Sequence, residues 1–133
     1  MIQEFVDVLV AAKPDLIKEF KTTRPNGYRD LFTRLVKLLS NEGYGRGAYD
    51  DPDPKRITVI NDGDYQGTLL FIVGAAGYQP YKYWACKVSY GSCSGCDTFQ
   101  ANRDGYGDDE ISDREAEGNY TMMLHMVQSI KEA

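Results

Sequence analysis

The chain has 133 residues, a length typical of a single domain that buries a core of its own. Its formal net charge is −5, and no basic stripe that would neutralise phosphates is visible, so we expect no nucleic-acid partner. No apolar run approaches the ~18 residues that cross a bilayer, and the first residues lack the basic start of a signal peptide, so we expect no membrane partner and a cytoplasmic location.

Two short helices are predicted at the start of the chain. Apolar residues recur every three or four positions over residues 2–12, which is the spacing of one helix face. Pro14 fits the first turn of a second helix that continues through Phe20, because the first turn leaves backbone N–H groups unpaired and proline has none to lose. The break between the two helices is expected near Lys13.

A third helix, with a stronger pattern, is predicted over residues 28–41. Its apolar residues form a continuous stripe, and Gly43 is a suitable terminator. The opposite face carries three basic residues, which we expect to be solvated: Arg29, Arg34 and Lys37. The glycines and prolines of residues 43–55 then predict a loop longer than usual, and long loops often carry function.

Three strands are predicted in the middle of the chain, and they should form an antiparallel meander: residues 57–60, 65–73 and 81–90. The run Asn-Asp-Gly-Asp over residues 61–64 is a turn signal that joins the first two strands. Successive side chains of a strand point to opposite faces, so Trp84, Cys86 and Val88 share one face, and Tyr83 lies on the other. The face with Trp84 is expected to point inward.

A last helix is predicted near the C-terminus. Ser112 and Glu115 have the spacing of a capping box, in which the first residue caps the helix and the fourth reaches back to it. Gly118 weakens the first turns by about 1 kcal/mol relative to alanine, so the pattern is strongest from Asn119 onward. The apolar face of this helix includes Tyr120, Met123, Leu124, Val127 and Ile130.

These elements predict an α+β fold in which a three-stranded antiparallel meander is flanked by N-terminal helices and a C-terminal helix. We expect one domain over residues 1–133, with a helical part over residues 1–42 and the sheet plus the last helix over residues 57–131. The sequence alone gives no oligomeric state.

A CxxC turn, Cys93-Ser94-Gly95-Cys96, precedes a short helix predicted over residues 97–103 with Asp97 as its cap. A helix N-terminus stabilises a thiolate, and a second thiol at this spacing can resolve a mixed disulfide, which would fit a thiol-dependent enzyme. The parallel βαβ frame of thioredoxin-like enzymes is missing, however. The small residues around the two cysteines favour a second interpretation, a tight structural turn.

Zinc is the remaining alternative, because CxxC supplies half of a tetrahedral site in a metal-dependent enzyme or a zinc-stapled structural module. Further ligands could come from Asp97, Cys86 or the single histidine, His125. Cys86 shares the phase of the inward strand face and is expected to behave as a small buried hydrophobe. The candidate metal ligands are therefore Cys93, Cys96 and His125, although the absence of a cofactor is the favoured expectation.

The ten tyrosines are the second functional signal, because tyrosine offers a large contact area with a polar tip. Several lie in or beside predicted loops and strand ends, together with one arginine. These are the candidate binding residues: Tyr44, Arg46, Tyr49, Tyr78, Tyr81, Tyr83 and Tyr106.

Three stretches of the C-terminal half resemble a family of small uncharacterised proteins encoded mainly by bacteriophages and prophages. They are GDYQGTLLFIV over residues 63–73, YWACKVSYGSCSGCDTFQ over residues 83–100 and YTMMLHMVQSIK over residues 120–131. The resemblance implies an accessory protein made inside an infected bacterium, and it transfers no catalytic residue. No nucleophile elbow, P-loop or dinucleotide fingerprint is present in the sequence, so we expect a protein that binds a host protein or a small ligand rather than an enzyme.

Overall fold

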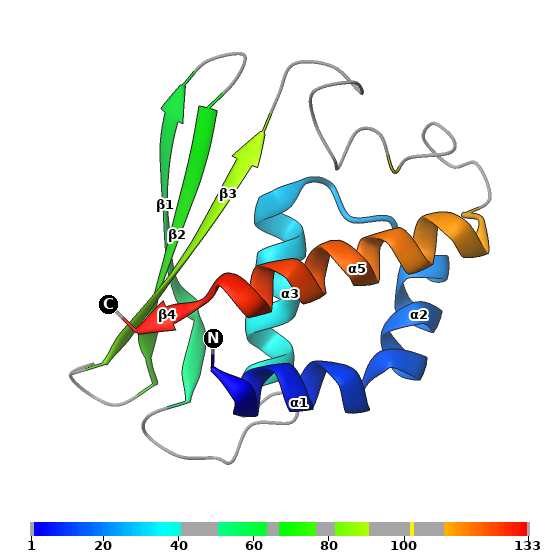
Figure 1. Cartoon of the computed structure of the whole chain (residues 1–133), viewed down its shortest axis with the longest axis horizontal. Helices are drawn as coiled ribbons and strands as arrows, with labels where there is room; N and C mark the ends of the chain where they lie inside the picture. Colours follow the sequence, from blue (N-terminus) through cyan, green and yellow to red (C-terminus); the bar gives the residue numbers. More distant parts are fainter. Residues whose placement is uncertain are drawn as a thin grey trace.

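The structure is a computed structural model that describes residues 2–40, 51–63, 67–76, 82–90, 102 and 111–132. Its helices are α1 (Gln3–Ala11), α2 (Lys13–Thr22), α3 (Tyr28–Leu39) and α5 (Asp113–Ser129). Its strands are β1 (Pro52–Gly63), β2 (Gly67–Ala75), β3 (Tyr83–Tyr90) and β4 (Lys131–Glu132). The sheet is antiparallel in the order β1-β2-β3-β4, and the helices lie on one side of it (Figure 1). The predicted α+β class is confirmed.

The two predicted helices at the start of the chain are confirmed as α1 and α2. Ala12 both ends α1 and caps α2, one residue before the predicted break at Lys13. Its N–H still donates to the Val8 carbonyl at 3.0 Å, and Pro14 lies in the first turn of α2 as expected. No helix in the described part of the chain is long and apolar enough to cross a membrane.

The prediction that the basic face of α3 is solvated was wrong for Arg34, whose side chain is only 13% exposed. Its guanidinium donates to the Thr23 carbonyl at 2.9 Å and pairs with Asp30 at 3.1 Å. The loop between α2 and α3 supplies the carbonyl, so Arg34 anchors that loop to α3. Arg29 and Lys37 are exposed, as predicted.

β1 is longer than the predicted strand at both ends. Pro52 already pairs with Ala75, so the loop predicted through residue 55 is wrong at its end. An irregularity between Pro52 and Ile57 accommodates the prolines, which are tolerated because β1 is an edge strand. At the other end, residues 61–63 pair with β2, so the turn predicted over residues 61–64 is wrong for these three residues.

β4 is a fourth strand that the sequence did not predict. It pairs with β3 through Glu132 opposite Trp84 and Lys131 opposite Ala85. A two-residue strand is too short to show a hydrophobic period, so it leaves no signal in the sequence.

One core joins the N-terminal helices to the sheet. The inner face of the sheet contributes the buried Phe71, Val73, Trp84 and Cys86, and the predicted inward phase of β3 is confirmed. Phe71 stacks on Phe32 of α3 with ring centres 4.6 Å apart. The helical part therefore packs directly on the sheet.

α5 begins at Asp113, six residues before the point at which its sequence pattern becomes strong. Ser112 caps it, since its Oγ accepts the Glu115 N–H at 3.1 Å. Gly118 also has a packing role, because a Cβ at this position would overlap the side-chain amide of Asn102. That amide donates to the Glu115 carbonyl and to Asn119 Oδ1, each at 3.0 Å, which ties Asn102 to the start of α5.

Candidate functional site

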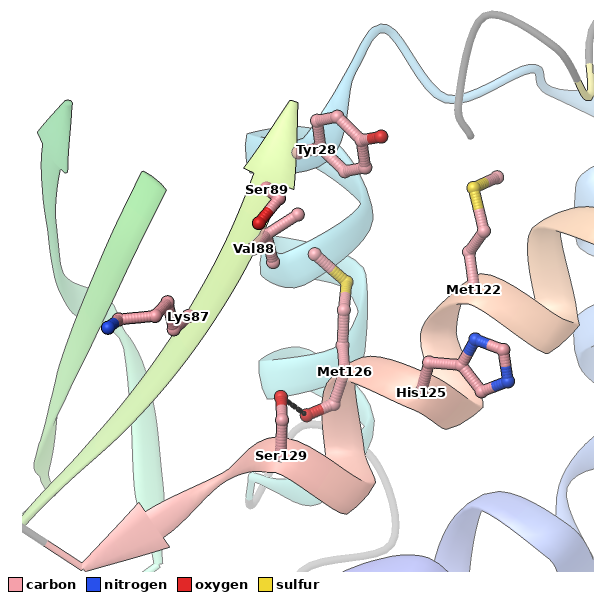
Figure 2. Close-up of a pocket in the computed structure, with 8 residues that line it drawn as sticks. All are labelled: Tyr28, Lys87, Val88, Ser89, Met122, His125, Met126 and Ser129. Atoms are coloured by element: carbon pink, nitrogen blue, oxygen red, sulfur yellow. Dashed lines mark hydrogen bonds between the residues drawn. The ribbon is translucent and has the colours of Figure 1, made fainter. Parts of the chain in front are cut away.

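A groove of about 220 Å³ lies where β3, α5 and the start of α3 meet (Figure 2). We call it the methionine groove. It is lined by Tyr28 of α3, by Lys87, Val88 and Ser89 of β3, and by Met122, His125, Met126 and Ser129 of α5. Residues four apart on a helix lie on one face, so α5 contributes two neighbouring rows, Met122 with Met126 and His125 with Ser129.

The floor of the groove is apolar. Met122 and Met126 are buried, with exposures of 7% and 4%, and Val88 and Tyr28 are half-buried beside them. Figure 2 shows Met126 pointing toward Val88 and Tyr28. Methionine has an unbranched, polarisable side chain that adapts to irregular shapes. The floor therefore suits an apolar group without demanding one particular outline.

The rim of the groove is polar. His125 and Ser89 are exposed, and Ser129 is half-buried. Ser129 Oγ donates to the Met126 carbonyl at 2.9 Å, which orients this hydroxyl at the end of α5 (Figure 2). The amine of Lys87 points away from the groove toward β2, so Lys87 contributes its backbone and stem rather than its charge (Figure 2).

Cys86 lies beneath the groove and is fully buried. Its Sγ is 3.2 Å from Ser129 Oγ and 3.5 Å from the Met126 carbonyl oxygen. Burial raises the pKa of the Cys86 thiol to about 11, an effect that the Ser129 hydrogen bond offsets only in part. A thiol that stays protonated is a poor nucleophile and a poor metal ligand at neutral pH. The expected role of Cys86 as a small buried hydrophobe is confirmed.

A second hollow, of about 350 Å³, lies between α2 and α3. It is more polar, and its central cation is Arg34, which is held by Asp30 at 3.1 Å and lies 3.9 Å from Glu19. The two acidic and two basic side chains that line it sum to zero charge, so the methionine groove is the stronger candidate for an apolar ligand.

Two of the residues predicted for the site fall within the described residues, and they lie on opposite sides of the sheet. His125 is at the rim of the methionine groove, whereas Tyr83 is 42% exposed on the face away from the helices. The other predicted binding residues lie outside the described residues: Tyr44, Arg46, Tyr49, Tyr78, Tyr81 and Tyr106. Cys93 and Cys96 also lie outside them.

The described residues include no group of three or more histidine, cysteine, aspartate or glutamate side chains placed to hold a metal ion. His125 belongs to no such group within these ranges, and its proposed partners Cys93 and Cys96 lie outside them. The zinc hypothesis therefore stays a prediction.

Sequence reasoning missed Tyr28, Met122, Met126 and Ser129 as site residues. A signal was present for two of them, since three of the four methionines fall within five positions of α5 and only Met123 belongs to its predicted apolar face. The groove forms where α3, β3 and α5 meet, and these elements are distant in the sequence. No local sequence pattern predicts that they come together. Comparisons with protein-family models, with curated proteins and with solved structures found no match to this chain.

Proposed function

We propose that this protein acts by binding rather than by catalysis, and that the methionine groove holds an apolar group of its partner. The observation that carries the proposal is the pair of buried methionines, Met122 and Met126, which form a ready apolar floor beneath a polar rim. Small-ligand sites commonly combine a mostly apolar concave surface with a few polar groups that orient the ligand.

The chemistry of the lining supports binding over catalysis. Among the described residues that line the groove there is no carboxylate and no thiol, and the Cys86 thiol beneath it has its pKa raised to about 11 by burial. His125 stands alone as a titratable imidazole at the rim. Nucleophilic catalysis would need a hydroxyl that donates its proton to His125, whereas the Ser129 hydroxyl donates to the Met126 carbonyl at 2.9 Å.

The resemblance to phage-encoded proteins supplies the proposed setting. In an infected bacterium the partner would be a host protein that inserts an apolar side chain, or a small host molecule with an apolar body. The host protein and the small molecule would each place an apolar group on the same methionine floor.

Methionine methyl groups give a direct test. Protein labelled with ¹³C at the methionine methyls should be titrated with indole and with hexanoate, two small apolar probes. We expect both probes to shift the Met122 and Met126 signals, while Met123, which is fully buried on the same helix, serves as the internal control. Substituting Leu for either Met122 or Met126 should weaken the shift of the methionine that remains, without unfolding the protein, because this exchange nearly conserves volume.

A second experiment addresses a protein partner. A photocrosslinker at the exposed Ser89 should capture a host protein, and added indole should reduce this capture. A crosslinker at the exposed Lys18 of α2 should give no capture that indole reduces. The groove is not the binding site if neither probe shifts the Met122 and Met126 signals more than the Met123 signal and if indole reduces no capture. Measurable turnover of a substrate would overturn the choice of binding over catalysis.

A further inference from the structure

The outer face of the sheet, opposite the helices, is the second surface of interest. We define it by Thr58, Ile60, Leu70, Ile72, Tyr83, Ala85, Lys87 and Lys131, which the strand register places on one side. No described element covers this face, and all the described helices pack on the other side (Figure 1). Of the residues that define it, Lys87 also lines the methionine groove, but its amine points away from that groove (Figure 2).

The centre of the outer face is aliphatic. Ile60 lies opposite Leu70, and Ile72 lies opposite Ala85, so the register brings these four side chains together across three strands. Ile60 is 49% exposed. The solvent side of a half-buried antiparallel sheet is normally polar, and a contiguous apolar patch with a polar border is typical of a protein-binding surface.

The border of the outer face is basic, although the chain as a whole carries a formal net charge of −5. Lys87 lies opposite Leu70, and Lys131 lies opposite Ala85, so the two lysines are diagonal neighbours at the β3–β4 side of the patch. Both are exposed, and neither forms an ion pair with any other described residue. Figure 2 shows the Lys87 amine directed away from α5 and toward β2.

We propose that the outer face docks an acidic amphipathic segment of another protein. Its apolar side chains would cover Ile60, Leu70 and Ile72, and its carboxylates would meet Lys87 and Lys131. Charge complementarity of this kind steers association and sets the register of the complex.

The same charges argue against other occupants. A second copy would offer no carboxylate among the residues that define the outer face, so it would leave Lys87 and Lys131 without a counter-charge. Nucleic acids and anionic membranes require many cations, and the acidic chain as a whole would be repelled by both.

The probe is a synthetic amphipathic helical peptide of about five turns, with leucine on one face and glutamate beside it, labelled for fluorescence anisotropy. We expect the double variant Lys87→Glu/Lys131→Glu to bind it at least ~10-fold more weakly. The control, Lys18→Glu/Lys37→Glu, makes the same change of charge at exposed positions of α2 and α3 and should bind within about twofold of the unchanged protein. Ile60→Ser should also weaken binding, because it removes the most exposed aliphatic side chain of the patch.

A charge-swapped peptide, with lysine in place of glutamate, should prefer Lys87→Glu/Lys131→Glu over the unchanged protein. Three outcomes would overturn the proposal. The acidic peptide could bind both double variants equally. Vesicles containing phosphatidylglycerol could bind the protein through the same lysines. Sedimentation could reveal a dimer that Ile60→Ser dissociates, which would make the outer face a contact between copies. Circular dichroism of each variant shows that the fold is kept.

Discussion

Arg24 holds Glu115 through two hydrogen bonds, with Nε 2.5 Å from Oε2 and Nη2 3.0 Å from Oε1. The two residues are 91 positions apart in the sequence, and their side chains are only 10% and 2% exposed. The pair joins the loop before α3 to the first turn of α5. It also places a negative charge at the N-terminus of α5, where the helix dipole favours it.

Arg24→Ala is expected to lower the free energy of unfolding by about 3–5 kcal/mol, because it removes the guanidinium that pairs with the buried Glu115 carboxylate. The matched control is Lys21→Ala, which removes an exposed ion pair with Asp113 at 2.6 Å in the same region. An exposed pair contributes at most about 1 kcal/mol. Urea unfolding measures both variants, and equal losses would show that Arg24–Glu115 behaves as a surface pair.

Gly118→Ala is expected to destabilise the protein, although helix propensity alone predicts a gain of about 1 kcal/mol. The added Cβ would overlap the Asn102 side-chain amide, whose hydrogen bonds to Glu115 and Asn119 would have to break. Asn102→Gly removes the obstructing side chain and should restore the gain from alanine. A double-mutant cycle by urea unfolding measures this coupling. If Gly118→Ala stabilises the otherwise unchanged protein, the contact with Asn102 is not present.

Arg34→Lys is expected to lower the free energy of unfolding by about 1–2 kcal/mol, because lysine cannot reproduce the planar fork of arginine. The fork bonds the Thr23 carbonyl and Asp30, and the guanidinium lies 5.8 Å from the centre of the Phe20 ring. Arg29→Lys is the control, since Arg29 is exposed on the same helix. Thermal and urea unfolding should show a loss of stability for Arg34→Lys and none for Arg29→Lys. If Arg34→Lys leaves the free energy of unfolding unchanged, the basic face of α3 is solvated as the sequence predicted.

The sequence predicted the elements whose signal is periodic or local. The spacing of apolar residues located α1, α2 and α3, Pro14 marked the start of α2, and alternation placed Trp84 and Cys86 on the inner face of β3. The cap at Ser112 was also readable, since it depends on a residue only three positions away.

The features that the sequence did not predict depend on distant contacts. Glu115 was interpreted through its local capping spacing, but its carboxylate is held by Arg24 from 91 positions away. From the local sequence, Gly118 only weakens the helix. Its close contact with the Asn102 side chain, which leaves no room for a Cβ, explains why glycine is present there. The methionine groove needs α3, β3 and α5 together, so neither Met122 nor Met126 could be assigned to a site from the pattern of α5 alone.

The CxxC turn calls for a measurement of mass, because Cys93 and Cys96 fall outside the described residues. Protein purified without added metal or reductant is expected to show the plain reduced mass in both native and denaturing spectra, as the structural-turn interpretation predicts. A native mass heavier by one zinc would support the metal hypothesis, with His125 as a further ligand to test by substitution. A loss of two hydrogens, after air oxidation is excluded, would support thiol redox chemistry.

Cys86 predicts how stability depends on alkaline pH. Burial raises the pKa of its thiol from 9.0 to about 11, so the folded state holds the proton more tightly than the unfolded state. The resulting stabilisation is fully present below pH ~9 and is lost as the pH rises toward ~11, and two pKa units correspond to about 3 kcal/mol. Cys93→Ser/Cys96→Ser leaves Cys86 as the single thiol, because the chain has three cysteines.

The comparison is between that variant and the same variant with Cys86→Ala. Tyr120, whose pKa is also raised by burial, is common to both and cancels in the difference of their unfolding free energies. We expect this difference to shrink between pH ~9 and ~11, since the thiol loses its advantage only as it ionises in the unfolded chain. The thiol should also react with a disulfide reagent far more slowly in folded than in unfolded protein at neutral pH. A difference that stays constant with pH, or a thiol that reacts equally fast in both states, would mean that Cys86 is accessible to solvent beneath the methionine groove.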